Sequence, residues 1–241
     1  MEVKTEAIVL GAIDYKDNDK LLTLFSPTLG KLTAGIRGVK KPNSKLNFAA
    51  QPFCFAEYVL AEKGGRYTVV SAYLHESFFS LRADIDRFYA ACAAAELCKK
   101  LSFENERYEG LFIGFAECLK SLSLSEEDPV EALLAFLQLA LRETGYPIDL
   151  SYLEECDGDI GDKLWFDFAD GRFTSFERCV AGERASLSTY HTLRKCAGLV
   201  YDEELLAGGK KRALRLIKAY LSEKTETSFE ALGEVLRLTE E

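Results

Sequence analysis

Residues 53–74 read FCFAEYVLAEKGGRYTVVSAYL, which is two runs of aromatic and β-branched residues around one turn signal. The alternation of large and smaller side chains is typical of strands, and Lys63-Gly64-Gly65-Arg66 between the runs is typical of a hairpin turn. The first eighty residues therefore predict five short strands. The other three runs of this kind lie earlier in the chain, at residues 7–10, 21–25 and 32–39.

Five short strands favour a closed barrel over an open sheet, because closure removes the unpaired strand edges that an open sheet of so few strands would expose. A five-stranded barrel of this length has the size of an OB-fold. We therefore expect residues 1–80 to form an N-terminal OB-fold domain.

After residue 80 the apolar residues recur at helical spacing. Residues 88–101 and 108–122 are the first two candidate helices. Asp128-Pro129 supplies an N-cap and a first-turn proline for a third helix at residues 130–142. Further helices are expected at residues 188–201, 209–222 and 228–238.

Between these helices the pattern returns to strand. Asp170-Gly171 is a strong hairpin signal between two aromatic runs, residues 164–168 and 172–176. The sequence thus predicts an α+β protein, in which a mainly α-helical domain at residues 81–241 contains a β-hairpin segment at about 156–180.

The composition is that of a globular protein, with 241 residues of which 48% are apolar and 29% charged. No uncharged apolar stretch approaches the ~20 residues of a membrane span, and no secretory signal is visible at the N-terminus. The seven cysteines are an odd number without framework spacing, which indicates a reducing compartment. We therefore expect a cytoplasmic protein with no membrane partner.

The net charge of −9 at pH 7 conceals a basic segment. From Lys20 to Ala56 there are six cations and no acid, and four of the cations lie in the loop-like stretch Arg37–Lys45, RGVKKPNSK. Such a loop suits phosphate groups, although a solvated loop is the usual alternative for an isolated basic stretch. The expected barrel favours nucleic acid. The predicted phosphate contacts are Lys20, Lys31, Arg37, Lys40, Lys41 and Lys45.

Two weaker features also concern nucleic acid. Lys211, Arg215 and Lys218 fall on one face of a predicted helix, and a solvated face is as good an interpretation as an extension of the DNA-binding surface. Aromatic side chains of the barrel are candidates for base stacking, although most must belong to the core. These aromatic residues are Phe25, Phe48, Phe53, Phe55, Tyr58, Tyr67 and Tyr73.

The sequence contains none of the common catalytic signatures, such as a phosphate-binding Gly-x-x-x-x-Gly-Lys loop, His-Glu-x-x-His or Gly-x-Ser-x-Gly. The chain has two histidines, His75 and His191. A Cys179–His191 pair is conceivable, but no orienting group accompanies it, so structural roles for both histidines are favoured. We therefore expect a protein that is not an enzyme.

The chain carries a series of short motifs, namely Lys4–Gly11, Asp14-Tyr15, Asp19–Ser26, Leu29–Leu32, Arg37–Pro42, Gln51–Phe53, His75–Phe78, Leu81-Arg82, Tyr89-Ala90, Glu96-Leu97 and Glu143–Leu150. In this order they resemble the bacterial RecO recombination-mediator family, most strongly over the first 85 residues. The resemblance implies an OB-fold, a helical C-terminal domain, binding of single- and double-stranded DNA without sequence preference, and strand annealing. It also implies a nucleoid-associated protein that works with RecR to replace single-strand-binding protein by RecA.

The family commonly carries a zinc site made of two Cys-x-x-Cys pairs, and this sequence departs from it. Cys156 and Cys179 stand at the first and last positions, whereas Asp159 and Phe176 stand at the two others. Phenylalanine cannot bind a metal, and three donors do not complete the tetrahedron of structural zinc. We therefore expect no zinc and no other cofactor. In its place we expect aromatic packing to hold the hairpin, through Trp165, Phe166, Phe168, Phe173 and Phe176.

Alternatives remain for the metal and for the function. His191 or Cys196 is conceivable as a fourth ligand, but neither has the short spacing of a preformed site. The runner-up function is an RNA-binding or ribosome-associated OB-fold protein. A cysteine-dependent enzyme is a third class, and it requires a reactive thiol at Cys156 or Cys179.

Overall fold

The computed structural model describes residues 1–124, 126–152, 164–199 and 208–239. Contacts divide the chain into two compact units, an N-terminal unit, Met1–Ser125, and a C-terminal unit, Glu126–Glu241. Strands give way to helices between Glu76 and Ile85, around the predicted end of the first domain at residue 80. The division by contacts lies later in the chain because two helices that follow the strands pack with them.

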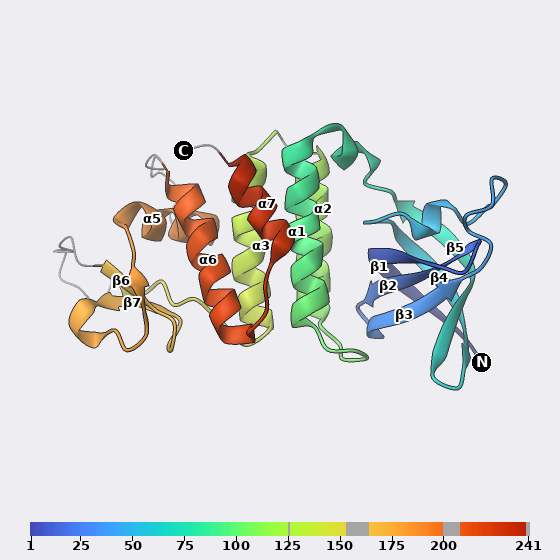
Figure 1. The fold of residues 1–241 in the computed structure, drawn as a ribbon, viewed down its shortest axis with the longest axis horizontal. Helices are drawn as coiled ribbons and strands as arrows, with labels where there is room; N and C mark the ends of the chain where they lie inside the picture. Colours follow the sequence, from blue (N-terminus) through green and yellow to red (C-terminus); the bar gives the residue numbers. More distant parts are fainter. Residues whose placement is uncertain (125, 153–163, 200–207, 240–241) are drawn as a thin grey trace. The chain divides into compact units, whose positions relative to one another are not determined.

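A closed five-stranded barrel begins the N-terminal unit, which confirms the predicted OB-fold (Figure 1). The order around the barrel is β1-β2-β3-β5-β4. All neighbouring strands are antiparallel except β3 and β5, whose parallel pairing closes the barrel. The strands are β1 (Glu2–Tyr15), β2 (Asp19–Ser26), β3 (Gly30–Ile36), β4 (Phe55–Lys63) and β5 (Arg66–Glu76).

β1 is much longer than the predicted strand at residues 7–10 because it pairs with two neighbours. Its first half pairs with β4 and its second half with β2, and the register to β2 shifts between Val9 and Gly11. β3 in contrast ends at Ile36, short of its predicted end, since Gly38 has a φ of +64° and turns the chain away. Inward-facing residues of all five strands form the apolar barrel core.

Two helices, α1 (Ile85–Leu101) and α2 (Glu109–Leu124), pack together and against the barrel. The ring centroid of Phe112 in α2 lies 5.8 Å from that of Phe25 and 6.1 Å from that of Phe55. These aromatic contacts cover one part of the outer barrel surface.

The first residues of β3 anchor the barrel to the same helices. The Nζ atom of Lys31 donates to the carbonyl oxygens of Lys99, at 2.6 Å, and Ser102, at 2.5 Å, at the C-terminus of α1. Gly30 has a φ of +70°, and a Cβ atom there would lie 2.0 Å from the carbonyl oxygen of Glu106. Only glycine permits this approach between the strand and the α1–α2 loop.

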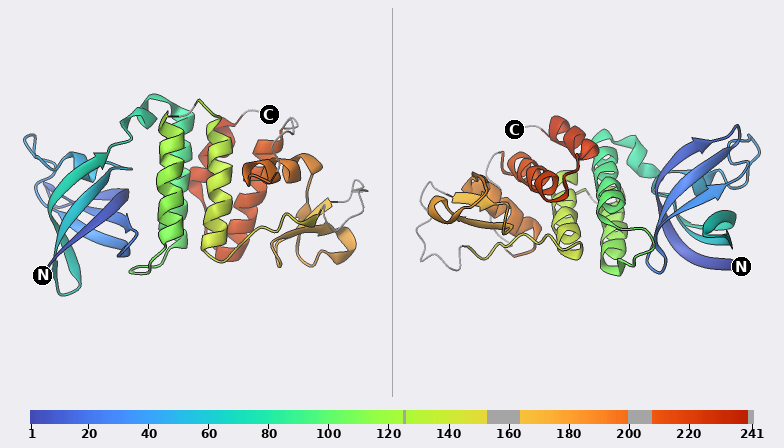
Figure 2. Two further views of the ribbon diagram at one scale, coloured as in Figure 1. Left: turned by 180° about the vertical axis from the view of Figure 1, so that it is seen from behind. Right: turned by 60° about the horizontal axis from the view of Figure 1, so that its bottom comes forward.

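The C-terminal unit combines helices with a small sheet. α3 (Pro129–Glu143) begins at the predicted Asp128 cap, and it contacts both α5 (Leu187–Cys196) and α6 (Gly209–Thr225). α7 (Glu230–Leu238) packs on α6. Figure 2 shows the sheet beside α6, away from α7. Its order is β7-β6-β8, from β6 (Leu164–Asp167), β7 (Arg172–Ser175) and β8 (Gly182–Arg184).

The predicted hairpin is therefore confirmed. β8 pairs with β6 as a third strand, which the sequence did not predict because β8 has only three residues and all of them are exposed. Aromatic packing holds the sheet as expected at Phe166 and Phe173, which are buried against Tyr220 and Tyr190 with ring centroids 5.3 and 4.9 Å apart. The expectation is wrong for Phe176, which is 61% exposed and packs its ring beside Trp165 and not in the core.

A buried carboxylate, Asp167, closes the turn after β6. It accepts hydrogen bonds from the backbone N–H groups of Ala169, at 2.8 Å, and Val180, at 2.7 Å. Burial opposes the charged form, but these hydrogen bonds outweigh it and lower the pKa of Asp167 below the ordinary value. The carboxylate thus ties the β6–β7 turn to the segment before β8.

Replacing Asp167 by Asn removes the charge and one acceptor while it keeps the shape. We expect Asp167→Asn to lower the free energy of unfolding by about 1–3 kcal/mol at pH 7. Because the folded pKa of Asp167 is lowered, its contribution is complete above about pH 4, the unfolded pKa, and is lost as the pH falls through the lower folded value. Urea titrations should therefore show that the difference in unfolding free energy between Asp167→Asn and the parent protein is smaller at pH 3 than at pH 7.

The matched control is Asp170→Asn, which changes an exposed carboxylate of the same turn. Its effect should stay below about 0.5 kcal/mol. Equal effects of the two substitutions would contradict the role given to Asp167.

Candidate nucleic-acid interface

The basic loop Arg37–Lys45 follows β3 and folds onto the turn between β1 and β2. The backbone N–H of Gly38 donates to Oδ1 of Asp19 at 2.8 Å, and that of Lys40 donates to the carbonyl oxygen of Asn18 at 3.1 Å. The left-handed conformation of Gly38 allows the chain to reverse at this point. The loop is therefore held in place by its backbone, and its long side chains are left to solvent.

Five of the six predicted phosphate contacts lie around this loop and fall into two groups. Arg37, Lys41 and Lys45 are exposed. Lys40 and Lys20 instead share one carboxylate, with their Nζ atoms 2.7 and 3.8 Å from Asp14. The hydrogen bond from Lys40 lowers the pKa of Asp14, and the charges of both lysines add to this effect. Lys40 and Lys20 consequently offer a weaker field to an incoming phosphate than the exposed cations do.

Lys31 is not beside the loop. It lies at the opposite end of β3, where its ammonium group caps α1 as described above. Burial lowers the pKa of Lys31, and Glu104 partly offsets the effect. The structure thus places Lys31 in the packing of strand against helix.

The β1–β2 turn adds one cation that sequence reasoning missed. Lys16 has a φ of +55°, and its Nζ atom lies 5.2 Å from the ring centroid of Tyr15. Lys16, Arg37 and Lys41 line a shallow hollow of about 510 Å³ together with the turn residues Asp17 to Asp19. Two loops therefore contribute cations to one surface.

Next to this hollow lies a mostly apolar stretch of sheet. Register pairs Ile13 with Leu21 and Leu21 with Gly35, and residues that pair across strands share a face. Ile13 is 64% exposed and Tyr15 is 46% exposed, although both are large and apolar or aromatic. We name this surface the outer face, and its residues are Gly11, Ile13, Tyr15, Asp19, Leu21, Thr23, Thr33 and Gly35.

The aromatic residues singled out by the sequence lie elsewhere. Phe25, Phe53 and Tyr58 are buried, and Phe48, Phe55 and Tyr67 are partly buried. Tyr73 is 74% exposed, but it pairs with Glu57 on β4 and lies outside the stretch of β1, β2 and β3 described above. Tyr15 is the exposed aromatic residue of the outer face, and sequence reasoning did not single it out. Its neighbours Asp14 and Lys16 are exposed as well, so no alternation in the sequence marks it.

The second cationic element is the amphipathic helix α6 of the C-terminal unit. Its apolar residues Leu214, Ile217 and Leu221 are buried, as the spacing predicts. Lys211 and Lys218 are partly buried, whereas Arg215 is exposed near Glu183.

Nucleophilic chemistry finds no support in the described cysteines. Burial raises the pKa of all six described thiols, to about 11 for Cys92 and about 12 for Cys118 and Cys196. Cys179 is among them, and the charge of Asp167 adds to its shift. A raised pKa disfavours the thiolate, which is the reactive form.

The histidines and metal positions can be placed in part. His75 packs on Phe55, with Nε2 3.4 Å from Glu6, and His191 packs on Tyr190. Cys156 and Asp159 lie outside the described residues. Within the described ranges, no three side chains of His, Cys, Asp or Glu form a group suited to a metal ion. The same ranges contain no helix with the length and apolarity that crossing a membrane requires.

Comparison with known proteins covers both units. The family model described as "Recombination protein O N terminal" matches residues 1–78, and "Recombination protein O C terminal" matches residues 82–232. The DNA repair protein RecO of Acetivibrio thermocellus is 28% identical over 203 residues, 84% of this chain and 80% of that protein. The one from Clostridium novyi is 29% identical over 208 residues, 86% of this chain and 71% of that protein. The one from Desulforamulus reducens is 34% identical over 158 residues, 65% and 60% of the two chains.

Proposed function

The chain belongs to the RecO family of DNA repair proteins, and from that premise we propose that it is a non-catalytic recombination mediator. It binds single- and double-stranded DNA without sequence preference and anneals complementary strands. With RecR, it helps RecA to replace single-strand-binding protein on DNA. Its place is the cytoplasm, in association with the nucleoid.

The observation that carries this proposal is the pairing of the outer face with the cations around it. In OB-folds the face of strands 2 and 3 and the loops beside it commonly hold oligonucleotides. Here that face is mostly apolar, its one carboxylate, Asp19, is hydrogen-bonded to the backbone of Gly38, and it is flanked by Lys16, Arg37 and Lys41. Cations bind the phosphates and the exposed Tyr15 ring stacks on a base, which is the usual combination for single strands.

The same arrangement supports binding without sequence preference. Phosphate contacts position a strand but read no sequence, and a ring stacks on the face of any base. The outer face offers the hydroxyls of Tyr15, Thr23 and Thr33, and its one carboxylate, Asp19, is engaged by the backbone of Gly38. It therefore presents no free bidentate reader of base edges.

Strand annealing follows from which parts of the strand remain accessible. A strand held by its phosphates and by base stacking keeps its Watson–Crick edges unbound. A complementary strand then pairs with those edges while the protein lowers the repulsion between the two backbones.

We further infer that the chain needs no zinc. The Asp167 carboxylate ties the β6–β7 turn to the segment before β8, and Phe166 and Phe173 are buried against Tyr220 and Tyr190, so the sheet is held without a metal ion. Structural zinc contributes on the order of 10 kcal/mol in small sites, so a genuine site is easy to detect.

Elemental analysis of the purified protein should find far less than one zinc per chain, and a chelator should leave its melting temperature unchanged. Cys156→Ser should melt like the parent protein. Stoichiometric zinc that disappears together with secondary structure in Cys156→Ser would refute the inference.

The cations of the basic loop should account for the salt dependence of DNA binding. Arg37→Ala with Lys41→Ala removes two exposed cations, so affinity for all single-stranded sequences should fall alike. The slope of log K against log salt should become shallower by about 1.4, or 0.7 for each contact. Fluorescence anisotropy with labelled oligonucleotides at several salt concentrations measures both effects.

The control is Lys99→Ala with Lys120→Ala, which removes the same charge from exposed positions on α1 and α2. This variant should keep the parent slope. Equal slopes for the two double variants would place the site elsewhere, and preference for RNA of matched length would favour the RNA-binding alternative.

Tyr15 should contribute to binding by stacking rather than by charge. We expect Tyr15→Ala to weaken binding of oligo(dT) by about 1–3 kcal/mol without a change in salt slope, since no cation is lost. Tyr15→Phe keeps a ring and should bind like the parent protein. Tyr73→Ala, at an exposed tyrosine outside the outer face, is the control and should have no effect.

A further inference from the structure

Two cations at the basic loop are paired with one acid of the same barrel. Oδ2 of Asp14 accepts a hydrogen bond from Nζ of Lys40 at 2.7 Å, and Oδ1 lies 3.8 Å from Nζ of Lys20. Among the described residues, no other carboxylate lies within ion-pair distance of either lysine. Both ammonium groups therefore converge on a single carboxylate.

The carboxylate is more exposed than the two lysines. The side chain of Asp14 is 63% exposed, against 35% for Lys40 and 29% for Lys20. Register explains this arrangement, because Asp14 pairs with Lys20, and Lys20 pairs with Ile36 of the barrel core. Asp14 thus continues the inward-facing register of the strands to the end of β1, where that register reaches solvent.

The attachment of the basic loop does not rest on Asp14 alone. Two hydrogen bonds of the loop backbone, from Gly38 to Asp19 and from Lys40 to Asn18, also hold it to the β1–β2 turn. Asp14, in contrast, bonds to the side chain of Lys40. Loss of its charge therefore leaves the loop attached and chiefly changes the field of the two lysines.

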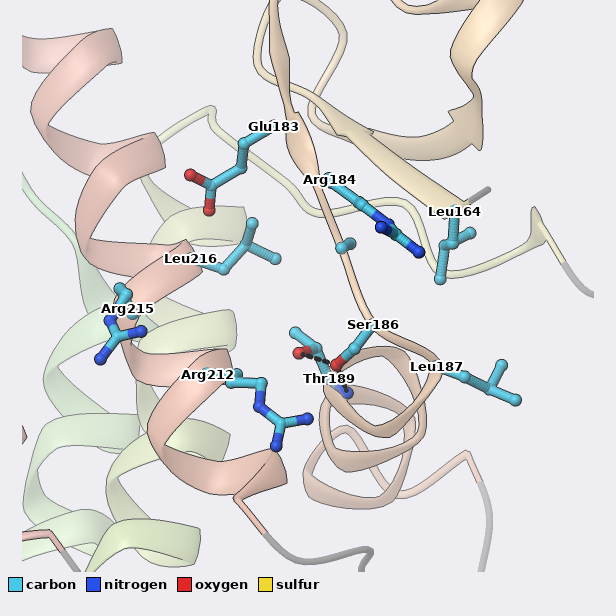
Figure 3. A pocket seen from close by; sticks show the side chains of 10 residues that line it. Leu164, Glu183, Arg184, Ser186, Leu187, Thr189, Arg212, Arg215 and Leu216 are labelled. Carbon is cyan, nitrogen blue, oxygen red and sulfur yellow. Dashed lines mark hydrogen bonds between the residues drawn. The ribbon is translucent and has the colours of Figure 1, made fainter. Parts of the chain in front are cut away.

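Convergence distinguishes these lysines from the arginines between β8 and α6. Arg184, Arg212 and Arg215 line a hollow of about 550 Å³ there. Figure 3 shows the guanidinium groups of Arg184 and Arg215 directed apart, and Arg212 donates to Oγ of Ser188 at 3.0 Å. Those arginines share no common point for an anion, whereas the two lysines of the barrel already hold one.

We propose that Asp14 is an internal competitor of the DNA phosphates, and that Lys20 and Lys40 are cations of the binding site that it occupies. The inference rests on the proposed function for its ligand and concerns the strength of the same site. A carboxylate and a phosphodiester each present two oxygens that share one negative charge, so either accepts hydrogen bonds from an ammonium group. Lys40 precedes Lys41, which lines the hollow at the outer face, so the occupied cations adjoin a bound strand.

Exchange of one anion for the other leaves no charge buried. Asp14 is exposed, so its carboxylate stays hydrated after a phosphate displaces it. Each lysine gives up one ion pair to form another, and it therefore contributes less to DNA binding than a free cation does. Asp14 thus weakens the hold on a strand and favours its release, which suits a protein that passes DNA on.

Asp14→Asn is the direct test, because asparagine keeps the shape of the side chain and removes its charge. We expect the affinity for oligo(dT) to rise about fivefold, the weight of an exposed ion pair. The slope of log K against log salt should become steeper by up to about 1.4, or 0.7 for each lysine released. A carboxylate that only held the loop would have the opposite effect, so an unchanged or shallower slope overturns the inference.

The matched control is Asp17→Asn, which removes the same charge from the adjoining turn. Asp17 lines the hollow, but among the described residues no lysine or arginine lies within ion-pair distance of it. Its affinity should stay within about twofold of the parent, with the parent slope. Equal gains in the two variants would indicate a general effect of charge and overturn the inference.

A Lys40→Ala background gives a second check on the same pair. There Asp14→Asn should steepen the slope by only about 0.7, since Lys20 is the cation left to release. An undiminished change would contradict the part given to Lys40.

Titration calorimetry with inorganic tripolyphosphate separates this inference from the proposed function, because this polyanion has phosphates but no bases. Tighter binding by Asp14→Asn than by the parent and Asp17→Asn supports the competitor even if oligonucleotides fail to bind. If the parent binds oligonucleotides through Arg37 and Lys41, but Asp14→Asn binds neither ligand more tightly, the proposed function stands and this inference falls.

Discussion

The double pairing of β1 is the constraint on which the N-terminal unit depends. One strand satisfies the hydrogen bonds of β4 along its first half and of β2 along its second half, so it bends where the register shifts near Val9 and Gly11. Together with the parallel pair β3–β5, this closes the barrel and leaves its strands without an open edge. Closure also fixes which side chains of β1, β2 and β3 must face solvent. The outer face is therefore a consequence of the barrel and does not depend on a mobile loop.

Helices α1 and α2 cover one part of the outside of the barrel and leave another part exposed. Phe25 and Lys31, which pair across β2 and β3, point to the helices and are covered by them. Further along the same two strands, Thr23 and Thr33 remain uncovered, and beyond them lies the basic loop. The two ends of β3 thus serve different purposes. The first end fastens the barrel to the helices, and the second presents cations.

The sequence was sufficient for the parts of the fold that depend on local patterns. Alternation and glycine turns predicted the five strands, and the Asp128-Pro129 cap and apolar spacing predicted α3 and the buried face of α6. It was insufficient wherever a partner distant in the chain decides the outcome. The sequence does not distinguish a lysine that binds phosphate from one that binds the protein's own backbone. Lys31 is of the second kind, since it donates to two carbonyl groups 68 and 71 residues away. The same limit hid Tyr15, because exposure of an aromatic residue on a barrel is set by closure rather than by its neighbours in sequence.

Acidic residues at the interface are best understood through the range of electrostatic forces. At physiological salt the Debye length is about 8 Å, so an exposed acid weakens the field of the basic loop appreciably only when it lies within about that distance. Asp14 and Asp19 lie within that range, and both are hydrogen-bonded to the loop itself, to Lys40 and to the backbone of Gly38. Their charges lower the local field, but their hydrogen bonds hold the loop against the β1–β2 turn. Arg37 and Lys41 are exposed on either side of the segment that these two carboxylates hold. A net charge of −9 is thus compatible with a phosphate-binding surface, since only the nearest charges act and the nearest acids position the cations.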